Sequence, residues 1–76
     1  MLGVIVPMAT LKELRFEAGY SYSELARRAD VSEPTVRRAE NGDPVQAIKA
    51  SQIVKALSEK LGRTIRVEDV DGLNIY

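Results

Sequence analysis

Residues 21–42 read SYSELARRADVSEPTVRRAENG and carry the clearest local signals of secondary structure in the chain. The stretch opens with Ser21 and Glu24, which have the spacing of a capping box. In a capping box, a hydroxyl and a carboxylate three residues later bond to backbone N–H groups at the start of a helix. Leu25 and the alanines that follow it supply an apolar face at helical spacing. The opening of the stretch therefore predicts a helix over 22–29.

The second half of the stretch carries the signals of another helix. Ser32 is a natural N-cap, and Pro34 fits the first turn, where its missing N–H costs little. The pair Asn41-Gly42 is typical of a helix end. We therefore expect a second short helix over 33–40.

A tight corner must join these two helices. Ala26, Val31 and Val36 are evenly spaced, which places a small residue at the helix crossing, a buried residue in the turn and another in the second helix. Asp30 lies at the corner, and aspartate is among the few residues other than glycine that tolerate a left-handed conformation. This arrangement is typical of a helix-turn-helix, whose second helix lies in the major groove of DNA.

Further helices are predicted on both sides of this unit. Thr10 and Glu13 form another capping box, and Gly19 suits the left-handed position that follows a helix. Downstream of the unit, apolar residues recur at helical spacing until Gly62. The additional helices are expected over 11–18, 45–61 and 67–70.

The two ends of the chain have extended character. The β-branched run VIV precedes Pro7, and the chain closes on LNIY. We expect strands over 3–6 and 73–76 that pair as a small two-stranded sheet, within one chain or across two. Because exposed strands are usually paired or covered, we expect this sheet to lie near a dimer contact.

The composition limits the class of protein. The 76 residues make one domain with a thin core, and 11 basic residues balance 11 acidic ones. The chain has neither cysteine nor histidine and no Gly-rich phosphate loop, so we expect no enzyme, no metal site and no cofactor. The apolar start, MLGVIVPM, is too short for a membrane span, so we expect no membrane partner. The lack of cysteine fits a cytoplasmic protein.

Four motifs occur in order along the chain: L-x-x-L-R, S-x-x-E-L-A, V-S-x-x-T-V and E-N-G. Over residues 11–61 the chain thereby resembles the phage-repressor-like (Cro/repressor, xenobiotic-response-element type) DNA-binding family. The resemblance implies a mostly α fold, a compact five-helix bundle. It also implies a prokaryotic or phage-encoded regulator that represses transcription as a homodimer on palindromic operators in double-stranded DNA.

The resemblance further implies which residues contact DNA. The helix over 33–40 would be the recognition helix, with Arg38 donating to guanine O6 and N7 and Glu33 accepting from cytosine N4. Tyr22 stands where the family commonly has glutamine and would bond to a phosphate through its hydroxyl. Asn41 would reach a phosphate through its N–H and its side chain. The DNA-binding residues expected in this way are Tyr22, Arg27, Arg28, Ser32, Glu33, Pro34, Thr35, Arg37, Arg38 and Asn41.

Two pairs of residues have a structural interpretation as well. Arg27 and Arg28 are equally well explained as a solvated helix face that pairs with neighbouring acids. Arg15 and Glu40 are implied, by the resemblance, to form an ion pair that links the first helix to the end of the recognition helix. The role of such a pair would be orientation, because a partly buried pair gives an uncertain net stability.

A protein-interaction module is the alternative function. The same fold would then act as an antitoxin- or anti-repressor-like binder of another protein, such as an anti-repressor, a toxin or a polymerase subunit. Zero net charge and the acidic stretch over 68–71 favour this alternative. Binding to random duplex DNA distinguishes the two, because a DNA binder loses affinity steeply as salt rises.

Overall fold

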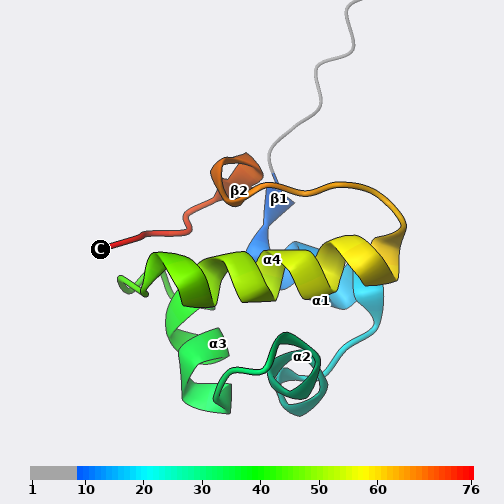
Figure 1. The fold of residues 1–76 in the computed structure, drawn as a ribbon, viewed down its shortest axis with the longest axis horizontal. Coiled ribbons are helices and arrows are strands. Elements are labelled where there is room, and N and C mark those ends of the chain that lie inside the picture. Colours follow the sequence, from blue (N-terminus) through cyan, green and yellow to red (C-terminus); the bar gives the residue numbers. More distant parts are fainter. Residues whose placement is uncertain (1–8) are drawn as a thin grey trace, which may run out of the picture.

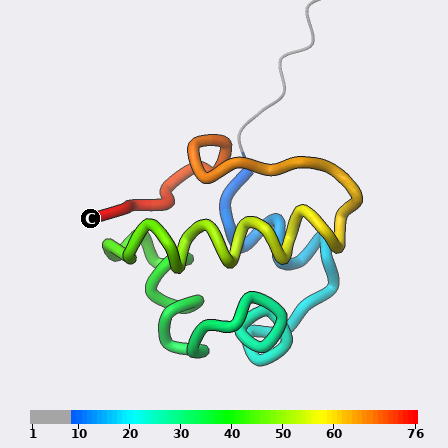
Figure 2. Tube along the Cα trace, viewed as in Figure 1, coloured from blue at the N-terminus to red at the C-terminus, as the bar shows by residue number. Residues whose placement is uncertain are grey.

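The computed structural model describes residues 9–76 and is mostly helical (Figure 1). Helix α4 runs across the middle of the molecule, with α2 and α3 on one side of it and the two strands on the other. The chain after α4 returns along that helix and ends beside the α3–α4 connection (Figure 2). The elements in this range are β1 (Ala9–Thr10), α1 (Leu11–Ala18), α2 (Tyr22–Ala29), α3 (Glu33–Glu40), α4 (Ala47–Leu61), the 3-10 turn η1 (Val67–Asp69) and β2 (Val70–Asp71).

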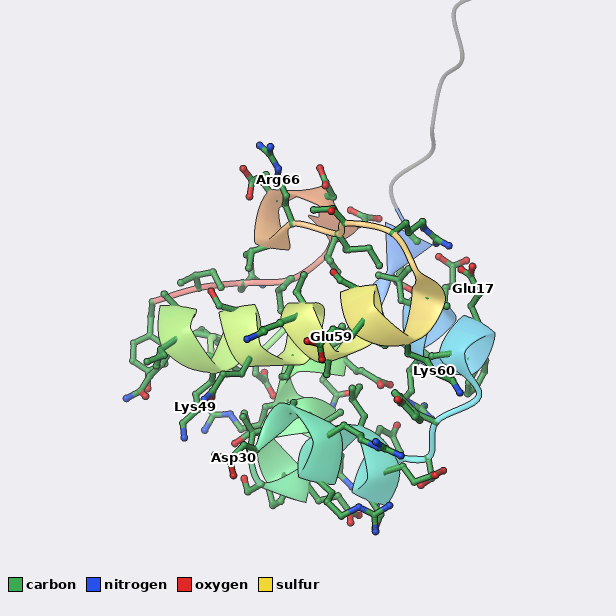
Figure 3. The ribbon with its side chains drawn as sticks, turned by 45° about the vertical axis from the view of Figure 1, so that its right-hand side comes forward. Glu17, Asp30, Lys49, Glu59, Lys60 and Arg66 are labelled. Atoms are coloured by element: carbon green, nitrogen blue, oxygen red, sulfur yellow. The ribbon has the colours of Figure 1, made fainter. Side chains whose placement is uncertain are left out.

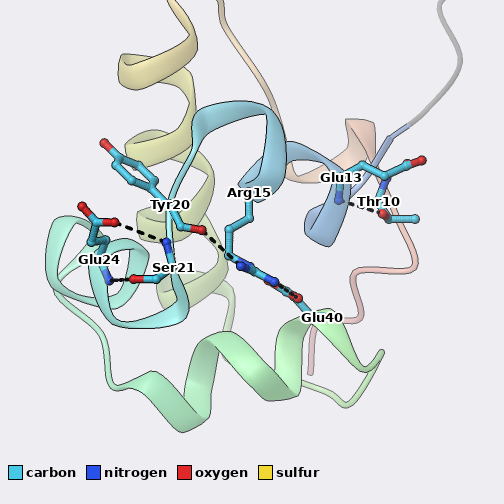
Figure 4. A network of polar contacts seen from close by, with 7 residues as sticks. All are labelled: Thr10, Glu13, Arg15, Tyr20, Ser21, Glu24 and Glu40. Atoms are coloured by element: carbon cyan, nitrogen blue, oxygen red, sulfur yellow. Dashed lines mark hydrogen bonds and ion pairs between the residues drawn. The ribbon is translucent and has the colours of Figure 1, made fainter.

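The helix starts follow from the capping boxes. The Thr10 hydroxyl accepts the Glu13 N–H at 3.1 Å, and the Glu13 carboxylate accepts the Thr10 N–H at 2.9 Å (Figure 4). Ser21 and Glu24 repeat this reciprocal pattern at the start of α2. Both boxes close as the sequence indicates, and Ser32 caps α3 by accepting the Thr35 N–H, so α1, α2 and α3 span the ranges expected for them.

One hydrophobic core joins the helices. Leu25 of α2, Val36 of α3 and both Ile53 and Leu57 of α4 have 0% of their surface exposed. Helix α2 packs against both α3 and α4, with the small side chain of Ala26 buried among them. Helix α3 is therefore held to the rest of the domain by its inner face.

The prediction of a fifth helix over 67–70 is wrong. The described residues contain four α-helices, and the segment in question forms only the three-residue 3-10 turn η1. The Asp69 carboxylate accepts the Arg66 N–H, which closes the turn. Val70 has an extended backbone, is buried and is the first residue of β2. The helical turn therefore cannot continue through it.

The sheet expected from the chain ends also needs correction. Residues 3–6 lie outside the described part of the chain, so the strand expected there has no structural test. The observed strands β1 and β2 pair in parallel, Ala9 opposite Val70. Residues 73–76 form no named strand; within them Ile75 makes an isolated bridge to Val45 of the same chain. The backbone of Val45 is committed to this bridge, so α4 begins at Ala47 rather than at residue 45.

The corner of the helix-turn-helix has the expected geometry. Asp30 has φ 59° and ψ 44°, the left-handed conformation that ends α2. Its N–H and the Val31 N–H satisfy carbonyl groups in the last turn of α2. A residue with a Cβ adopts the left-handed conformation only at a cost in conformational energy. Substitution of Asp30 therefore tests whether the backbone conformation limits the stability of the corner.

Replacing Asp30 with glycine is expected to raise the free energy of unfolding by about 0.5–1 kcal/mol. The left-handed conformation costs an ordinary residue about 1–2 kcal/mol, which exceeds the extra backbone entropy that glycine loses on folding. Urea unfolding followed by circular dichroism measures the change, and Asp30→Ala serves as the control with the opposite sign. A less stable Asp30→Gly variant would show that the Asp30 carboxylate, not the backbone, stabilises the corner.

Candidate nucleic-acid interface

Helix α3 presents a continuous outer face. Val36 and Ala39 are buried and fix the inner face of the helix. The remaining side chains up to the last turn are exposed or half-buried and point away from the core. They are Glu33, Pro34, Thr35, Arg37 and Arg38, so the structure brings the expected recognition residues onto one accessible surface.

An ion pair fixes this helix against α1, as the resemblance implies. The Arg15 Nε and Nη2 atoms donate to the two carboxylate oxygens of Glu40, and Nη1 donates to the Tyr20 carbonyl at 3.1 Å (Figure 4). The side chains are only 7% and 4% exposed. The bond to Glu40 raises the pKa of Arg15 above its ordinary value despite burial. The pair therefore locks the end of α3 to both α1 and the α1–α2 connection.

The ring of Tyr22 lies between the buried Arg15 and the exposed Arg37 of α3. The Arg15 guanidinium lies 4.1 Å from the centre of the Tyr22 ring, and the Arg37 guanidinium lies 4.5 Å from it. Such contacts between a cation and an aromatic ring are favourable. The ring of Tyr22 thus connects the buried pair to an exposed arginine of α3, and its phosphate contact stays a prediction.

Arg37 is engaged within the protein. Its Nη2 atom donates to the Glu33 carboxylate one turn earlier, at 3.0 Å, and the Ser23 hydroxyl donates to the other oxygen of Glu33 at 3.1 Å. The bonds from Arg37 and then from Ser23 lower the pKa of Glu33 below its ordinary value. Glu33 is therefore charged at neutral pH and offsets the charge of Arg37 on this face.

Arg38, unlike Arg37, forms no ion pair with a carboxylate in residues 9–76. The Arg38 Nη2 atom donates to the Pro44 carbonyl at 3.0 Å. Nearby, the hydroxyls of Ser32 and Thr35 lie 2.7 Å apart, and Ser32 accepts the Thr35 N–H as the N-cap of α3. Arg38 is thus an exposed cation without an ion-pair partner in residues 9–76.

The comparison with protein families agrees with this geometry. The model of the helix-turn-helix family, of Cro/C1 type, matches residues 11–67. The chain belongs to the helix-turn-helix family. No curated protein and no solved structure matches the chain. The family match supports double-stranded DNA binding by a regulator. Among residues 9–76, no helix of this helix-turn-helix domain has the length and apolar character needed to cross a bilayer.

Three of the expected DNA-binding residues of the helix-turn-helix domain are placed differently from the rest. Arg28 lines a cavity with Ala56 and Glu59 of α4, so it lies on the side of α2 that faces α4. Arg27 is exposed one turn after Ser23, on the side of α2 that contacts α3. The Asn41 N–H, expected to reach a phosphate, instead donates to the Arg37 carbonyl and caps α3, which corrects that expectation; the Asn41 residue itself is exposed.

The sequence does not indicate two further residues that lie beside this surface. Lys49 and Tyr76 line a small cavity together with Thr35 and Arg38 of α3. From its sequence context Lys49 is an ordinary surface charge, and Tyr76 is remote from α3 along the chain. Only the pairing of the C-terminal segment with Val45 brings Tyr76 to the helix-turn-helix, and no local pattern encodes such a long-range pairing.

Proposed function

We propose that this domain binds double-stranded DNA in a sequence-specific manner, with α3 in the major groove, and represses transcription. The observation that carries the proposal is the exposed Arg38, without an ion-pair partner in residues 9–76, on the outer face of a helix clamped by Arg15 and Glu40. Arginine is suited to guanine because it donates to O6 and N7 together. Contacts to phosphates from Tyr22, Thr35 and the side chain of Asn41 set the register of the protein on DNA. Contacts to the base edges select the DNA sequence.

Glu33 gives this surface its selectivity. It stands at the start of α3 and holds Arg37 by an ion pair, so the charge available to phosphates is reduced. Attraction to the backbone is the part of DNA binding that ignores sequence. A recognition helix that carries a carboxylate therefore binds random DNA weakly, and discriminates through the base pairs that satisfy Glu33 and Arg38.

Replacing Glu33 with glutamine is expected to strengthen binding to random duplex DNA. The change removes a negative charge and releases Arg37, so a plot of log affinity against log salt should steepen by roughly 0.9 for each additional phosphate that the protein neutralises. Fluorescence anisotropy of a labelled duplex measures this. Glu17→Gln is the matched control, because Glu17 is also an exposed carboxylate paired with an arginine, but it lies on α1 (Figure 3). Equal effects of both variants would place Glu33 outside the interface.

We propose a dimer as the DNA-binding form. One domain of this size contributes few base contacts, and two domains on half-sites about one helical turn apart double them. Such a dimer requires a palindromic operator. Light scattering in the presence of the bound duplex measures the stoichiometry, and a complex with a single protein chain would contradict this part of the proposal.

The salt dependence of binding tests the function itself. The wild-type protein is titrated into a labelled random duplex at several salt concentrations. Affinity that falls steeply as salt rises is the expected result, because counterions are released on binding. No binding at the lowest salt concentration would contradict the proposal.

A protein-interaction module is the second candidate, and one observation favours it. A groove of about 550 Å³ runs between α4 and the segment that follows it, with Val54, Ile65 and Val67 in its lining. Apolar grooves of this kind fit amphipathic segments of partner proteins. Retention of DNA binding by variants with a polar residue in the groove, such as Val67→Ser, would separate this surface from the DNA-binding one.

A further inference from the structure

The last residues of the chain are anchored to the α3–α4 connection. The Val45 N–H donates to the Asn74 carbonyl at 3.0 Å, and the Tyr76 N–H donates to the Val45 carbonyl at 3.1 Å. The Asn74 side chain also donates to the Gly42 carbonyl. We call residues 73–76 the C-terminal tail. It lies beyond the family match, which ends at residue 67, so the match does not describe its position.

The tail brings Tyr76 to the edge of the recognition surface. Tyr76 helps to line a cavity of about 110 Å³ that opens beside α3. Tyr76 is 72% exposed although its backbone is fixed at Val45. The ring therefore adds little to the core, and the backbone of Tyr76 is fixed beside the α3–α4 connection.

The lining of this cavity has the chemistry of an anion site. The lining residues include two with cationic side chains, two with hydroxyl groups and one with a side-chain amide, and none of them is an aspartate or a glutamate. Lys49 extends from α4 on the side that carries α2 and α3 (Figure 3). In residues 9–76, neither Arg38 nor Lys49 forms an ion pair with an acid. The cavity is lined by Thr35, Arg38, Pro44, Val45, Gln46, Lys49 and Tyr76.

We propose that the C-terminal tail is part of the DNA-binding surface, with the Tyr76 hydroxyl and the Lys49 ammonium bound to one backbone phosphate next to the base that Arg38 reads. The inference rests on the proposed function. A hydroxyl and an ammonium are both donors that phosphate oxygens accept, and contacts of this kind fix register rather than sequence. The tail would thereby hold Arg38 in register on its base.

Substitutions at the two donors test this proposal. The probe is a labelled duplex that the wild-type protein recovers from a random pool. Tyr76→Phe is expected to weaken binding about 10-fold through loss of one charge-assisted hydrogen bond. Lys49→Gln is expected to reduce the slope of log affinity against log salt by roughly 0.9. A neutral methylphosphonate at the contacted phosphate should reduce the effect of Tyr76→Phe, because the remaining phosphoryl oxygen accepts only an ordinary hydrogen bond and no longer a charge-assisted one.

The other end of α4 supplies matched controls. The Lys60 ammonium lies 5.7 Å from the centre of the Tyr20 ring, so Tyr20→Phe and Lys60→Gln make the same chemical changes away from α3. Both controls should bind like the wild type, and circular dichroism should show all four variants folded. Wild-type binding that neither Tyr76→Phe nor Lys49→Gln alters would overturn the inference and leave the proposed function standing. A wild-type protein that binds no duplex would overturn both.

A partner protein on the tail is the remaining outcome. Without DNA, the masses of the wild type and of Tyr76→Ala are compared by light scattering. Equal masses are expected if the tail binds DNA and not another protein chain. A lower mass for the variant would show that the tail is an interface between copies of the chain, and would overturn its role at the phosphate.

Discussion

Replacing Glu40 with alanine is expected to lower the free energy of unfolding by about 3–5 kcal/mol, because it leaves the Arg15 charge buried without its partner. The side chains of Arg15 and Glu40 are both more than nine-tenths buried. Three nitrogen atoms of Arg15 donate hydrogen bonds, two to Glu40 and one to the Tyr20 carbonyl. A small domain has few kcal/mol to lose, so the variant should be largely unfolded at moderate urea concentrations. Urea unfolding followed by circular dichroism measures this.

Two further variants separate stability from orientation. Glu17→Ala breaks the exposed pair with Arg63 and should change stability far less, since exposed pairs contribute little. The double variant Arg15→Met with Glu40→Leu replaces the buried pair by apolar groups of similar size, and such replacements are often neutral. We expect the double variant to fold but to lose discrimination between duplexes, because α3 is no longer locked to α1. A stable Glu40→Ala variant would contradict the buried ion pair.

Replacing Arg38 with alanine is expected to weaken binding to the preferred duplex by about 10- to 100-fold, the cost of losing one bidentate contact with guanine. The fold should be unaffected, because Arg38 is exposed and its hydrogen bond in the protein goes only to the Pro44 carbonyl. Anisotropy titrations with the preferred duplex and with a duplex altered at one base pair measure the effect.

The comparison between the duplexes is the decisive part of that experiment. Arg38→Ala should bind both duplexes with similar affinity, whereas the wild type distinguishes them. Arg28→Ala is the matched control, since Arg28 is an exposed arginine of α2 that lies beside α4 rather than on α3. An Arg38→Ala variant that keeps the wild-type preference would show that another residue reads the base.

Local signals in the sequence predict the helix-turn-helix unit well. The hydroxyl and carboxylate of each capping box act within four residues, so Thr10 and Ser21 locate the starts of α1 and α2. The left-handed corner at Asp30 is also a local property of the chain. The Arg15–Glu40 pair depends on the resemblance instead, because 25 residues separate the partners.

The C-terminal part of the domain is predicted less well, for a physical reason. Extended segments form when they find a partner strand, and the partner is not encoded nearby. Residues 73–76 read as a strand, yet their observed partner is Val45, in a region expected to be helical. The same pairing shortens α4, ends the chain near α3 and brings Tyr76 to Arg38. One long-range contact therefore accounts for most of the differences.

The outer face of α3 shows the limit of reasoning from residue types. Sequence pattern places Arg37 and Arg38 together, and the structure separates them by partner: Arg37 is held by Glu33 and Tyr22, and Arg38 is not. A distinction of this kind depends on side-chain geometry across two helices. It changes the role that each arginine is proposed to have.

Selection of bound duplexes from a random pool tests the central claim most directly. The wild-type protein is mixed with random double-stranded DNA at low salt, and the retained duplexes are sequenced after several rounds. We predict a shared palindromic motif with half-sites about one helical turn apart and guanine at a fixed position in each. Retained duplexes with no common sequence, or no retained DNA at all, would contradict the claim that α3 reads the bases of DNA.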